Sequence, residues 1–409
     1  MLLFFLRHIA TLPIVYWKKI ILPSPKDEFS FLFSIAMCYT VKGVHHNDFE
    51  REAFLMKKIV LTGGGTLGHV TPHLSLIPHL QKAGYEIHYI GTEKGMEAEK
   101  IQSVPGVTYH AVKSGKLRRY FSWQNFTDPF RVIAGVFQSA ALMGKIKPDV
   151  VFSKGGFVAV PVVFGAWMNR IPVVCHESDL TPGLANKLCK PFARKIATTF
   201  PECAEALGAK AEMTGTPLRP ELFHGSRAKG LSLLHFDGSK PILLMMGGSS
   251  GAQAVNKALR EALPELLPQF DVAHLCGKGN LDASLEGTPG YTQIELLSAE
   301  LPDALACTDL VLSRAGSNAL CEFQALCKPM LLVPYPKGAS RGDQILNAQS
   351  LEKRGLCRVL LQENMTAATL VSALRSTWND REQLTAAMEA APPADGTQRV
   401  LELIEEVQK

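Results

Sequence analysis

Short apolar runs alternate with amphipathic stretches from Met56 onward. Apolar runs of about five residues, bounded by Gly, Pro or Asn, are typical of buried strands in parallel sheets, and the stretches between them have helical periodicity. The alternation predicts repeated strand–helix units. The predicted strands of the first series are 59–62, 86–91, 150–153, 173–176, 196–199 and 211–214, and the predicted helices are 71–83, 130–146 and 159–169.

A second series of the same kind begins at Pro241. Its predicted strands are 242–246, 271–275, 294–296, 310–313, 330–334 and 358–361, with a helix at 252–267. Two prolines interrupt the pattern at 215–220, and we expect 225–240 to be polar and irregular. The fold class predicted is therefore α/β, with two Rossmann-like parallel-sheet domains facing a cleft, at 56–218 and 219–409. A final apolar stripe predicts a terminal helix able to pack back on the first domain: Val400, Leu403, Ile404 and Val407.

The first 55 residues do not share this pattern. Residues 1–22 are apolar, but Arg7 and His8 interrupt a stretch already shorter than the ~20 residues of a membrane-spanning helix. No small-residue cleavage site follows cleanly. An over-extended start ahead of Met56, a peripheral anchor, and a signal or disordered segment remain open interpretations.

Composition narrows the class of protein. The 409 residues are 46% hydrophobic and 20% charged, which excludes a disordered chain, a collagen-like repeat and a polytopic membrane protein. The net charge of +5 is too small to indicate a nucleic-acid partner. The nine cysteines are scattered without C-x-x-C spacing, so neither a disulfide framework nor a zinc site is indicated, and reduced thiols in a cytosolic enzyme fit best.

A glycine-rich loop lies between the first strand and the first helix. Its glycines are Gly63, Gly64, Gly65 and Gly68, with Thr66 among them. Amide N–H groups and a helix N-terminus at such a turn favour an anionic or charge-developing group. A dinucleotide site with Glu93 on the ribose is one interpretation. His69 instead favours a site in which an acceptor hydroxyl attacks an electrophile, because that hydroxyl needs a base.

The second domain has a matching loop, in which Gly248 and Ser249 offer an amide and a hydroxyl to a phosphate. Arg219, in the predicted hinge, is the cation expected for a donor diphosphate, although it could equally be a solvated arginine. Two facing anion sites suit a nucleotide-diphosphate donor on one side and a phosphate-bearing acceptor on the other.

Polar residues open two later helices of the second domain. Glu322 falls inside the first of them, where a carboxylate can accept both hydroxyls of a ribose. Gln344 and Asn347 begin the next helix beside Asp343 and are candidates to bind sugar hydroxyls, whereas Asp343 alone would be typical of a helix cap.

The last polar group follows the strand that ends near His176. Glu177, Asp179 and Asn186 are expected at the carboxyl ends of the first sheet, where open α/β sheets bind ligands. No D-x-D occurs in the chain, so no metal or other cofactor is predicted, and helix N-termini, Ser249 and Arg219 are expected to neutralise the leaving group.

These motifs together resemble glycosyltransferase family 28, specifically the transferases of peptidoglycan synthesis. The strings that carry the resemblance cover essentially all of 56–409 in order: GGGTLGHVTP, FSKGGFVAVP, HESDLTPGLANK, TGTPLR, GGSSGAQAVN, SRAGSNALCEFQALCKPMLLVPYP and DQILNA. The resemblance implies a GT-B fold and a metal-independent inverting transfer of N-acetylglucosamine (GlcNAc). The implied donor is UDP-GlcNAc, the acceptor is the C4 hydroxyl of the N-acetylmuramoyl sugar of lipid I, and the product is lipid II.

The resemblance also implies roles for single residues. Glu322 matches the ribose-binding glutamate, and Arg219, Ser249 and Gly248 match the diphosphate contacts. Gln344 and Asn347 match the residues that bind GlcNAc, and Asn186, Thr66 and Gly68 are also assigned to the donor. Gly63, Gly64 and Gly65 are assigned to the acceptor pyrophosphate. Two positions depart from the family pattern: Asp179 replaces a frequent Asn, and Leu67 replaces a Gly. The base is therefore left open between His69 and Asp179.

A basic and aromatic segment predicts contact with a membrane. It contains Lys113, Lys116, Arg118, Arg119, Tyr120, Phe121, Trp123 and Phe126. Cations beside interfacial aromatics suit an anionic bilayer, so we expect peripheral attachment at the cytoplasmic face of the cell membrane, unless the aromatics pack into the core. Other open functions are a diacylglycerol glycosyltransferase, a dinucleotide-dependent oxidoreductase and a non-catalytic binding protein.

Overall fold

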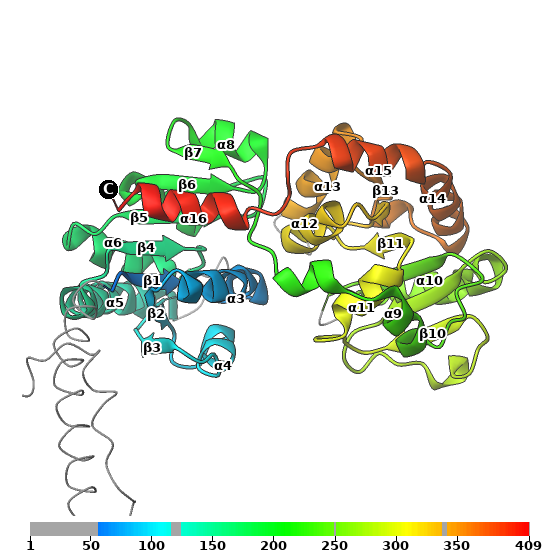
Figure 1. Ribbon diagram of the computed structural model, residues 1–409, viewed down its shortest axis with the longest axis horizontal. Helices are drawn as coiled ribbons and strands as arrows, with labels where there is room; N and C mark the ends of the chain where they lie inside the picture. The colour runs from blue at the N-terminus through cyan, green and yellow to red at the C-terminus, as the bar shows by residue number, and fades with distance from the viewer. Residues whose placement is uncertain (1–55, 116–123, 249–250, 338–341, 409) are drawn as a thin grey trace, which may run out of the picture. The chain divides into compact units, whose positions relative to one another are not determined.

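Two parallel sheets, built one after the other along the chain, organise the protein (Figure 1). The computed structural model describes residues 56–115, 124–248, 251–337 and 342–408. Within these ranges the first sheet has seven strands in the order β3-β2-β1-β4-β5-β6-β7, and the second has six in the order β10-β9-β8-β11-β12-β13. The prediction of two Rossmann-like α/β sheets is confirmed.

The first series comprises β1 (Lys58–Thr62), α3 (Leu67–Lys82), β2 (Glu86–Gly91), α4 (Met96–Ile101), β3 (Val107–Ala111), α5 (Gln124–Ile146), β4 (Val150–Ser153), α6 (Ala159–Met168), β5 (Val173–Glu177), α7 (Leu184–Cys189), β6 (Lys195–Thr198), α8 (Pro201–Leu207) and β7 (Ala211–Met213). The second comprises α9 (Arg227–Leu234), β8 (Ile242–Met246), α10 (Gln253–Leu266), β9 (Asp271–Leu275), β10 (Tyr291–Ile294), α11 (Leu301–Cys307), β11 (Leu310–Ser313), α12 (Ser317–Ala325), β12 (Met330–Leu332), α13 (Asp343–Lys353), β13 (Arg358–Val359), α14 (Ala367–Asn379), α15 (Arg381–Ala390) and α16 (Thr397–Glu406).

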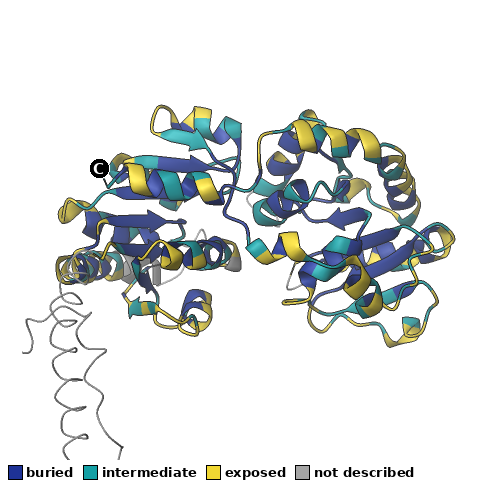
Figure 2. Ribbon diagram, in the orientation of Figure 1, coloured by how far each residue is buried: buried dark blue, intermediate teal, exposed yellow. Residues whose placement is uncertain are grey.

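The strand orders fix where ligands can bind. In the first sheet the order reverses between β1 and β4, and in the second between β8 and β11. Helices on both faces bury the central strands, which Figure 2 shows in dark blue. Open α/β sheets bind ligands beyond the carboxyl ends of the strands at such a reversal. The glycine loops after β1 and β8 lie at these two places.

Several local predictions were wrong or incomplete, including the helix expected at 130–146, which begins at Gln124. The strand β3 was missed, because three of its five residues are only half-buried at the sheet edge and two are exposed, which gives no clear apolar run. The strand expected at 294–296 is β10 and ends where that prediction begins. Residues 225–240 are not irregular, since they include α9, which the Ser226 side chain caps. The first helix begins at Leu67 rather than 71, after extended backbone at Thr66.

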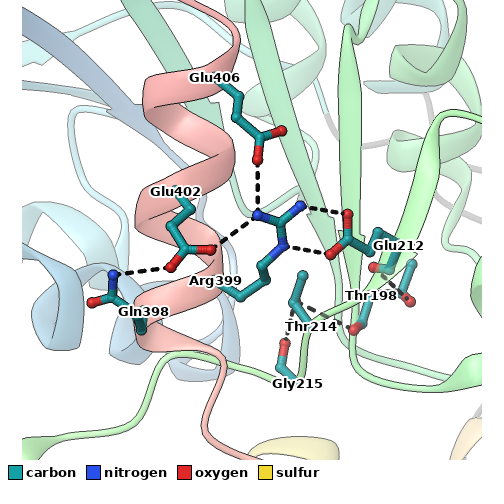
Figure 3. A network of polar contacts seen from close by, with 8 residues as sticks. All are labelled: Thr198, Glu212, Thr214, Gly215, Gln398, Arg399, Glu402 and Glu406. Carbon is teal, nitrogen blue, oxygen red and sulfur yellow. Dashed lines mark hydrogen bonds and ion pairs between the residues drawn. The ribbon is translucent and has the colours of Figure 1, made fainter.

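The last helix packs on the first sheet. The apolar stripe of α16 is buried in the same core as Ile59 and Leu61 of β1. Figure 1 shows α16, in red, beside β6. Arg399 of α16 forms ion pairs with Glu212 of β7 and with Glu402 and Glu406 of its own helix (Figure 3). The chain therefore completes its first hydrophobic core with its final residues.

The two segments that cross between the sheets pair with each other. Thr216 N–H donates to the Ala394 carbonyl at 3.0 Å, and Gly396 N–H donates to the Thr216 carbonyl at 2.9 Å. The Thr397 hydroxyl accepts from Leu218 N–H at 3.1 Å. These bonds tie the return segment to the outgoing one. In the part of the chain that the structure describes, no helix has the length and apolar character needed to cross a membrane.

Replacing the core leucine of α16 tests this packing. Leu403 is fully buried, so we expect Leu403→Ala to lower the free energy of unfolding by about 2–5 kcal/mol through lost burial and a residual cavity. Chemical denaturation followed by circular dichroism measures the change. Glu405→Ala, at an exposed position of the same helix, should change stability by less than about 0.5 kcal/mol. Equal effects of the two substitutions would contradict the packing of α16.

Candidate functional site

Two glycine loops meet at the strand reversal of the first sheet. One follows β1 and contains Gly64 and Gly65, and the other follows β4 and contains Gly156. Gly156 has a φ of +83°, and a Cβ there would lie 2.2 Å from the Gly64 carbonyl oxygen. Gly65 has a φ of +89° and would meet the Phe157 ring at 2.6 Å. Both positions therefore favour glycine: each has a left-handed φ, a side chain at Gly156 would collide with the Gly64 backbone, and one at Gly65 would collide with the Phe157 ring.

A buried carboxylate already occupies part of the first loop. Glu97, at the start of α4, is fully buried and accepts hydrogen bonds from Thr92 N–H and from Gly65 N–H, the latter at 3.3 Å. One of the three amides predicted for the acceptor pyrophosphate is thus paired within the chain. Glu97 was not predicted from the sequence, because a glutamate in a short amphipathic helix normally faces solvent.

The candidate base lies in the first turn of α3. Thr66 is the N-cap residue, and its Oγ1 is 3.0 Å from Nδ1 of His69. His69 is half-buried, at the positive end of the helix. Pro72 lacks an N–H, so the Gly68 carbonyl has no helical donor four residues later. Nδ2 of Asn318, from α12, donates to that carbonyl at 3.1 Å.

Glu177 organises the loop after β5. Its Oε1 accepts from the N–H groups of Ser178 at 2.9 Å and Asp179 at 3.2 Å. Its Oε2 accepts from Gly183 N–H and from Nδ2 of Asn186, both at 2.8 Å. Burial raises the pKa of Glu177, and the four donors offset that penalty. Asn186 lines the cavity beside this loop, and its Nδ2 donates to Glu177 and to the His176 carbonyl, while its Oδ1 has no hydrogen-bond partner.

His69 and Asp179 line a common cavity of about 440 Å³. Its other polar residues include Thr66, Glu177 and Asn186. Its apolar wall consists of Val132, Phe157, Val160, Leu184, Ala185 and Leu188. An imidazole and a carboxylate beside an apolar wall suit an amphiphilic substrate with a hydroxyl to be deprotonated.

The second sheet places Glu322 and Arg219 together. Glu322, in α12, is 7% exposed, and its Oε1 lies 3.4 Å from Nη2 of Arg219. Burial raises the pKa of the Glu322 carboxyl, and the nearby guanidinium opposes that rise. Nε of Arg219 has no hydrogen-bond partner. The pair thus combines an acceptor for hydroxyls with a cation for an anionic group. Gly248 is exposed at a φ of +89°, and Ser249 lies outside the described residues.

Asn347 joins α13 to the loop after β5. It is fully buried in α13, and its Oδ1 accepts from Leu180 N–H at 2.9 Å. Its Nδ2 donates to Asp179 Oδ1 at 3.2 Å and to the Ala315 carbonyl at 3.3 Å. Asn347 thus contacts the loop of Asp179 through both atoms of its amide, and its predicted contact with a sugar stays a prediction. Gln344 accepts from Tyr335 N–H at 3.2 Å.

A second cavity, of about 300 Å³, joins residues from both series. It is lined by Gly68, Asp179, Gly316, Ser317, Asn318, Ala319, Asp343 and Gln344. The structure therefore brings Gly68, Asp179 and Gln344 together as predicted positions of one site, whereas Glu322, Arg219 and Gly248 lie outside this lining. Asp179 lines both cavities. Among the described residues, no cluster of His, Cys, Asp and Glu side chains is arranged to hold a metal ion.

The segments that form the two sheets each match a known family domain. Residues 59–198 match the glycosyltransferase family 28 N-terminal domain, and residues 242–407 match the glycosyltransferase family 28 C-terminal domain. The second match includes α16, although this helix packs on the first sheet.

Curated relatives match over nearly their whole length. A protein of Geobacillus thermodenitrificans is 53% identical over 352 residues, which cover 86% of this chain and 99% of the relative. A protein of Lachnospira eligens is 53% identical over 355 residues, which cover 87% of this chain and 100% of the relative. Both are named UDP-N-acetylglucosamine–N-acetylmuramyl-(pentapeptide) pyrophosphoryl-undecaprenol N-acetylglucosamine transferase.

Solved structures agree with the fold. MurG of Acinetobacter baumannii aligns with a TM-score of 0.69 and 25% identity, covering 86% of this chain and 99% of that protein. The glycosyltransferase of kitacinnamycin aligns with a TM-score of 0.67 at 16% identity, which supports the two-sheet GT-B fold alone.

The contact between the two glycine loops gives a test with a matched control. Gly84 has nearly the same φ as Gly156, +79°, but no atom within 4 Å of an added Cβ. We expect Gly84→Ala to cost about 1–2 kcal/mol for the left-handed backbone alone. Gly156→Ala adds a collision with the Gly64 backbone, so it should cost several kcal/mol more. Denaturant titration measures both variants, and equal losses of stability would argue against the close approach of the loops.

Proposed function

Because the chain belongs to glycosyltransferase family 28, we propose that it transfers GlcNAc from UDP-GlcNAc to the C4 hydroxyl of the N-acetylmuramoyl sugar of lipid I, yielding lipid II. The geometric observation that carries the proposal is the position of Asp179. It lines the cavity that contains His69 and an apolar wall, and also the cavity that contains Gln344. An acceptor in the first cavity and a donor sugar in the second would meet at this residue.

The second sheet supplies the donor site. Glu322 accepts the ribose hydroxyls of the uridine, while Arg219 and the loop of Gly248 and Ser249 contact the diphosphate. The N-terminus of α12 adds a positive dipole end next to the cavity, because Ser317 and Asn318 are its first residues and line it. Gln344, in the same cavity, binds the sugar, and Asn347 holds Asp179 in place.

The reaction is a single displacement with inversion. The C4 oxygen of the acceptor forms a bond to the anomeric carbon of GlcNAc, and the bond from that carbon to the β-phosphate oxygen breaks. The electron pair of the broken bond leaves with UDP, where Arg219 and the helix N-termini stabilise the added negative charge. The proton of the C4 hydroxyl passes to a base of the enzyme.

His69 is our choice as that base. It lies in the first turn of α3 on the wall of the larger cavity, and Thr66 orients its Nδ1. Asp179 accepts a hydrogen bond from Asn347 and is part of the loop that Glu177 fixes. We therefore assign Asp179 the role of a positioning residue. An Asn, which the family resemblance gives as a frequent residue at this position, could fill that role without titrating.

A transfer assay tests the function and the base. Labelled GlcNAc should move from UDP-GlcNAc to a lipid I analogue. UDP-glucose should not replace UDP-GlcNAc as the donor, and diacylglycerol should not replace lipid I as the acceptor. His69→Ala should lower kcat by about 10²–10⁴-fold, because general-base catalysis contributes that much, with UDP affinity unchanged by calorimetry.

Asp179→Asn is the matched variant. It keeps the size of the side chain and the contact with Asn347, so it should retain most of the activity. Loss of turnover in Asp179→Asn with activity kept in His69→Ala would reverse the assignment. Preferred transfer to diacylglycerol, or binding of NAD(H) instead of UDP, would refute the proposed reaction.

Peripheral attachment to an anionic membrane is the second part of the proposal. Residues 116–123 of the predicted basic segment, with Arg118, Arg119 and Trp123, lie outside the described residues. Directly after them, α5 exposes Phe130, Ile133 and Phe137 at helical spacing. The helix α6, packed on α5, exposes Trp167 and Met168, and α7, packed on α6, exposes Leu184 and Leu188. This apolar surface adjoins the cavity of the lipid-linked acceptor, because Leu184 and Leu188 also line it.

Vesicle binding tests the apolar surface of α5. Replacing Phe130, Ile133 and Phe137 together by Ser should weaken binding to phosphatidylglycerol vesicles by at least about 100-fold, because each buried side chain contributes about 1.5–3 kcal/mol. Sedimentation with vesicles measures it. Phe223, Leu281 and Leu296 of the second series are similarly exposed, and their replacement by Ser is the control. Similar losses in both triple variants would rule out α5 as the specific attachment surface.

A further inference from the structure

A buried lysine lies beneath the site and has no part in the transfer described above. Lys154 follows β4, between Ser153 and the glycine pair Gly155 and Gly156, and is 1% exposed. Its Nζ lies 2.6 Å from His176 Nδ1, 2.5 Å from Ser178 Oγ and 3.3 Å from Thr216 Oγ1. An ammonium group has three N–H donors, so these three acceptors satisfy it fully.

The partners of His176 fix the direction of these bonds. His176 is fully buried, and its Nε2 lies 2.9 Å from the Gly215 carbonyl oxygen. A carbonyl oxygen can only accept, so Nε2 carries the proton. Burial and the charge of Lys154 lower the pKa of His176 well below its usual value, so the ring is neutral. Nδ1 is then an acceptor, and Lys154 is the donor to it.

The three hydrogen bonds of Lys154 connect parts of the chain whose relative positions matter for the reaction. Ser178 precedes Asp179 in the loop that Glu177 fixes from its other side. Thr216 and Gly215 belong to the segment that leads from the first sheet to the second and pairs with the returning chain. Lys154 thus joins the loop that lines both cavities to the crossing between the sheets.

We infer that Lys154 is a positioning residue for the transfer reaction, whose ammonium group holds the loop of Ser178 and Asp179 against the segment of Gly215 and Thr216. This inference deepens the proposed function and rests on it. Without the ammonium, Ser178 and His176 each lose a donor inside the protein, and the loop loses its bond to the crossing segment, so its position relative to His69 is less well defined. A displacement of about 1 Å near reacting groups can cost about 100-fold in rate.

The charges around Lys154 make this role sensitive to pH. Burial lowers the pKa of Lys154 to about 7, and the carboxylates of Glu177 and Asp179 and the thiol of Cys321 oppose that change. His73 of α3 and His176 of β5 also face it, and burial, with the charge of Lys154, lowers the pKa of each. Those two rings stay neutral near pH 7, so the group that titrates there is the lysine.

The sign of the effect on activity follows from the donor count. Above the pKa the amine has two N–H donors for three acceptors, so positioning weakens and kcat falls as the pH rises through about 7. The effect on folding has the opposite sign. Between about 7 and the ordinary value of 10.5 the unfolded chain binds more protons at Lys154, so the contribution of this group to stability rises with pH. The two trends separate lost positioning from lost folding.

Lys154→Met tests the inference, with the pH dependence of kcat as the readout. Methionine occupies a similar volume but cannot donate. At saturating donor and lipid I analogue, we expect kcat to fall about 10–100-fold while the affinity for UDP stays within twofold. The fall of kcat above neutral pH that we expect for the unaltered enzyme should be absent from the variant. Lys257→Met, at an exposed lysine of α10, is the control and should match the unaltered enzyme.

Ser178→Ala keeps the lysine and removes one acceptor. It should lower kcat several-fold and move the alkaline fall of kcat to lower pH, because the ammonium form loses a partner. Combined with Lys154→Met it should add nothing further, as expected for two members of one network. This variant serves as the test if Lys154→Met does not fold.

An unchanged alkaline limb in Lys154→Met, or additive effects of the two substitutions, would overturn the inference. Absence of GlcNAc transfer by the unaltered protein would instead overturn the proposed function, so the two failures are distinguishable.

Discussion

The site depends on one buried carboxylate that is nearly surrounded by donors. Glu177 ends β5, and three backbone N–H groups and the Asn186 amide point at its two oxygens. A carboxylate in a buried position is stable only when such donors compensate for lost water. The loop of 178–183 therefore wraps around Glu177 in one conformation and carries Asp179 to the place where two cavities meet. Asn347 fixes the other side of the same loop, from α13. The first sheet thus supplies both the anchor of this loop and the strand end that presents it.

Most of the fold could be predicted from the sequence because parallel strands bury both faces. Continuous apolar runs such as Ile242–Met246 and Val150–Ser153 leave no ambiguity of period, and the observed strands have those bounds. Prediction failed where burial is partial. The edge strand β3 lacks such a run, and α9 is short and nearly balanced between polar and apolar residues. The start of α3 was placed late because Gly68 and Pro72 are unfavourable in helices, yet the packing of α3 in the core outweighs them.

The candidate site was predictable where chemistry follows a strand or begins a helix. His69, Asp179 and Gln344 were selected on that basis; His69 lines the larger cavity, Gln344 lines the smaller one, and Asp179 lines both. Lys154 and Glu97 were not, because nothing local distinguishes a buried charge from a solvated one. Their burial comes from residues far away in the sequence, such as Thr216 for Lys154 and Gly65 for Glu97. Asn186 and Asn347 were correctly placed near the site, but which partner each amide binds is decided by tertiary contacts alone.

The placement of α16 has a consequence for biosynthesis. The strands of the first sheet are synthesised long before residues 397–406, yet the apolar stripe of α16 is buried in the core beside β1. During translation the nascent first domain therefore exposes an uncovered apolar face until α16 has been synthesised. Translation products that stop before residue 397 would leave this face open to aggregation or to chaperone binding.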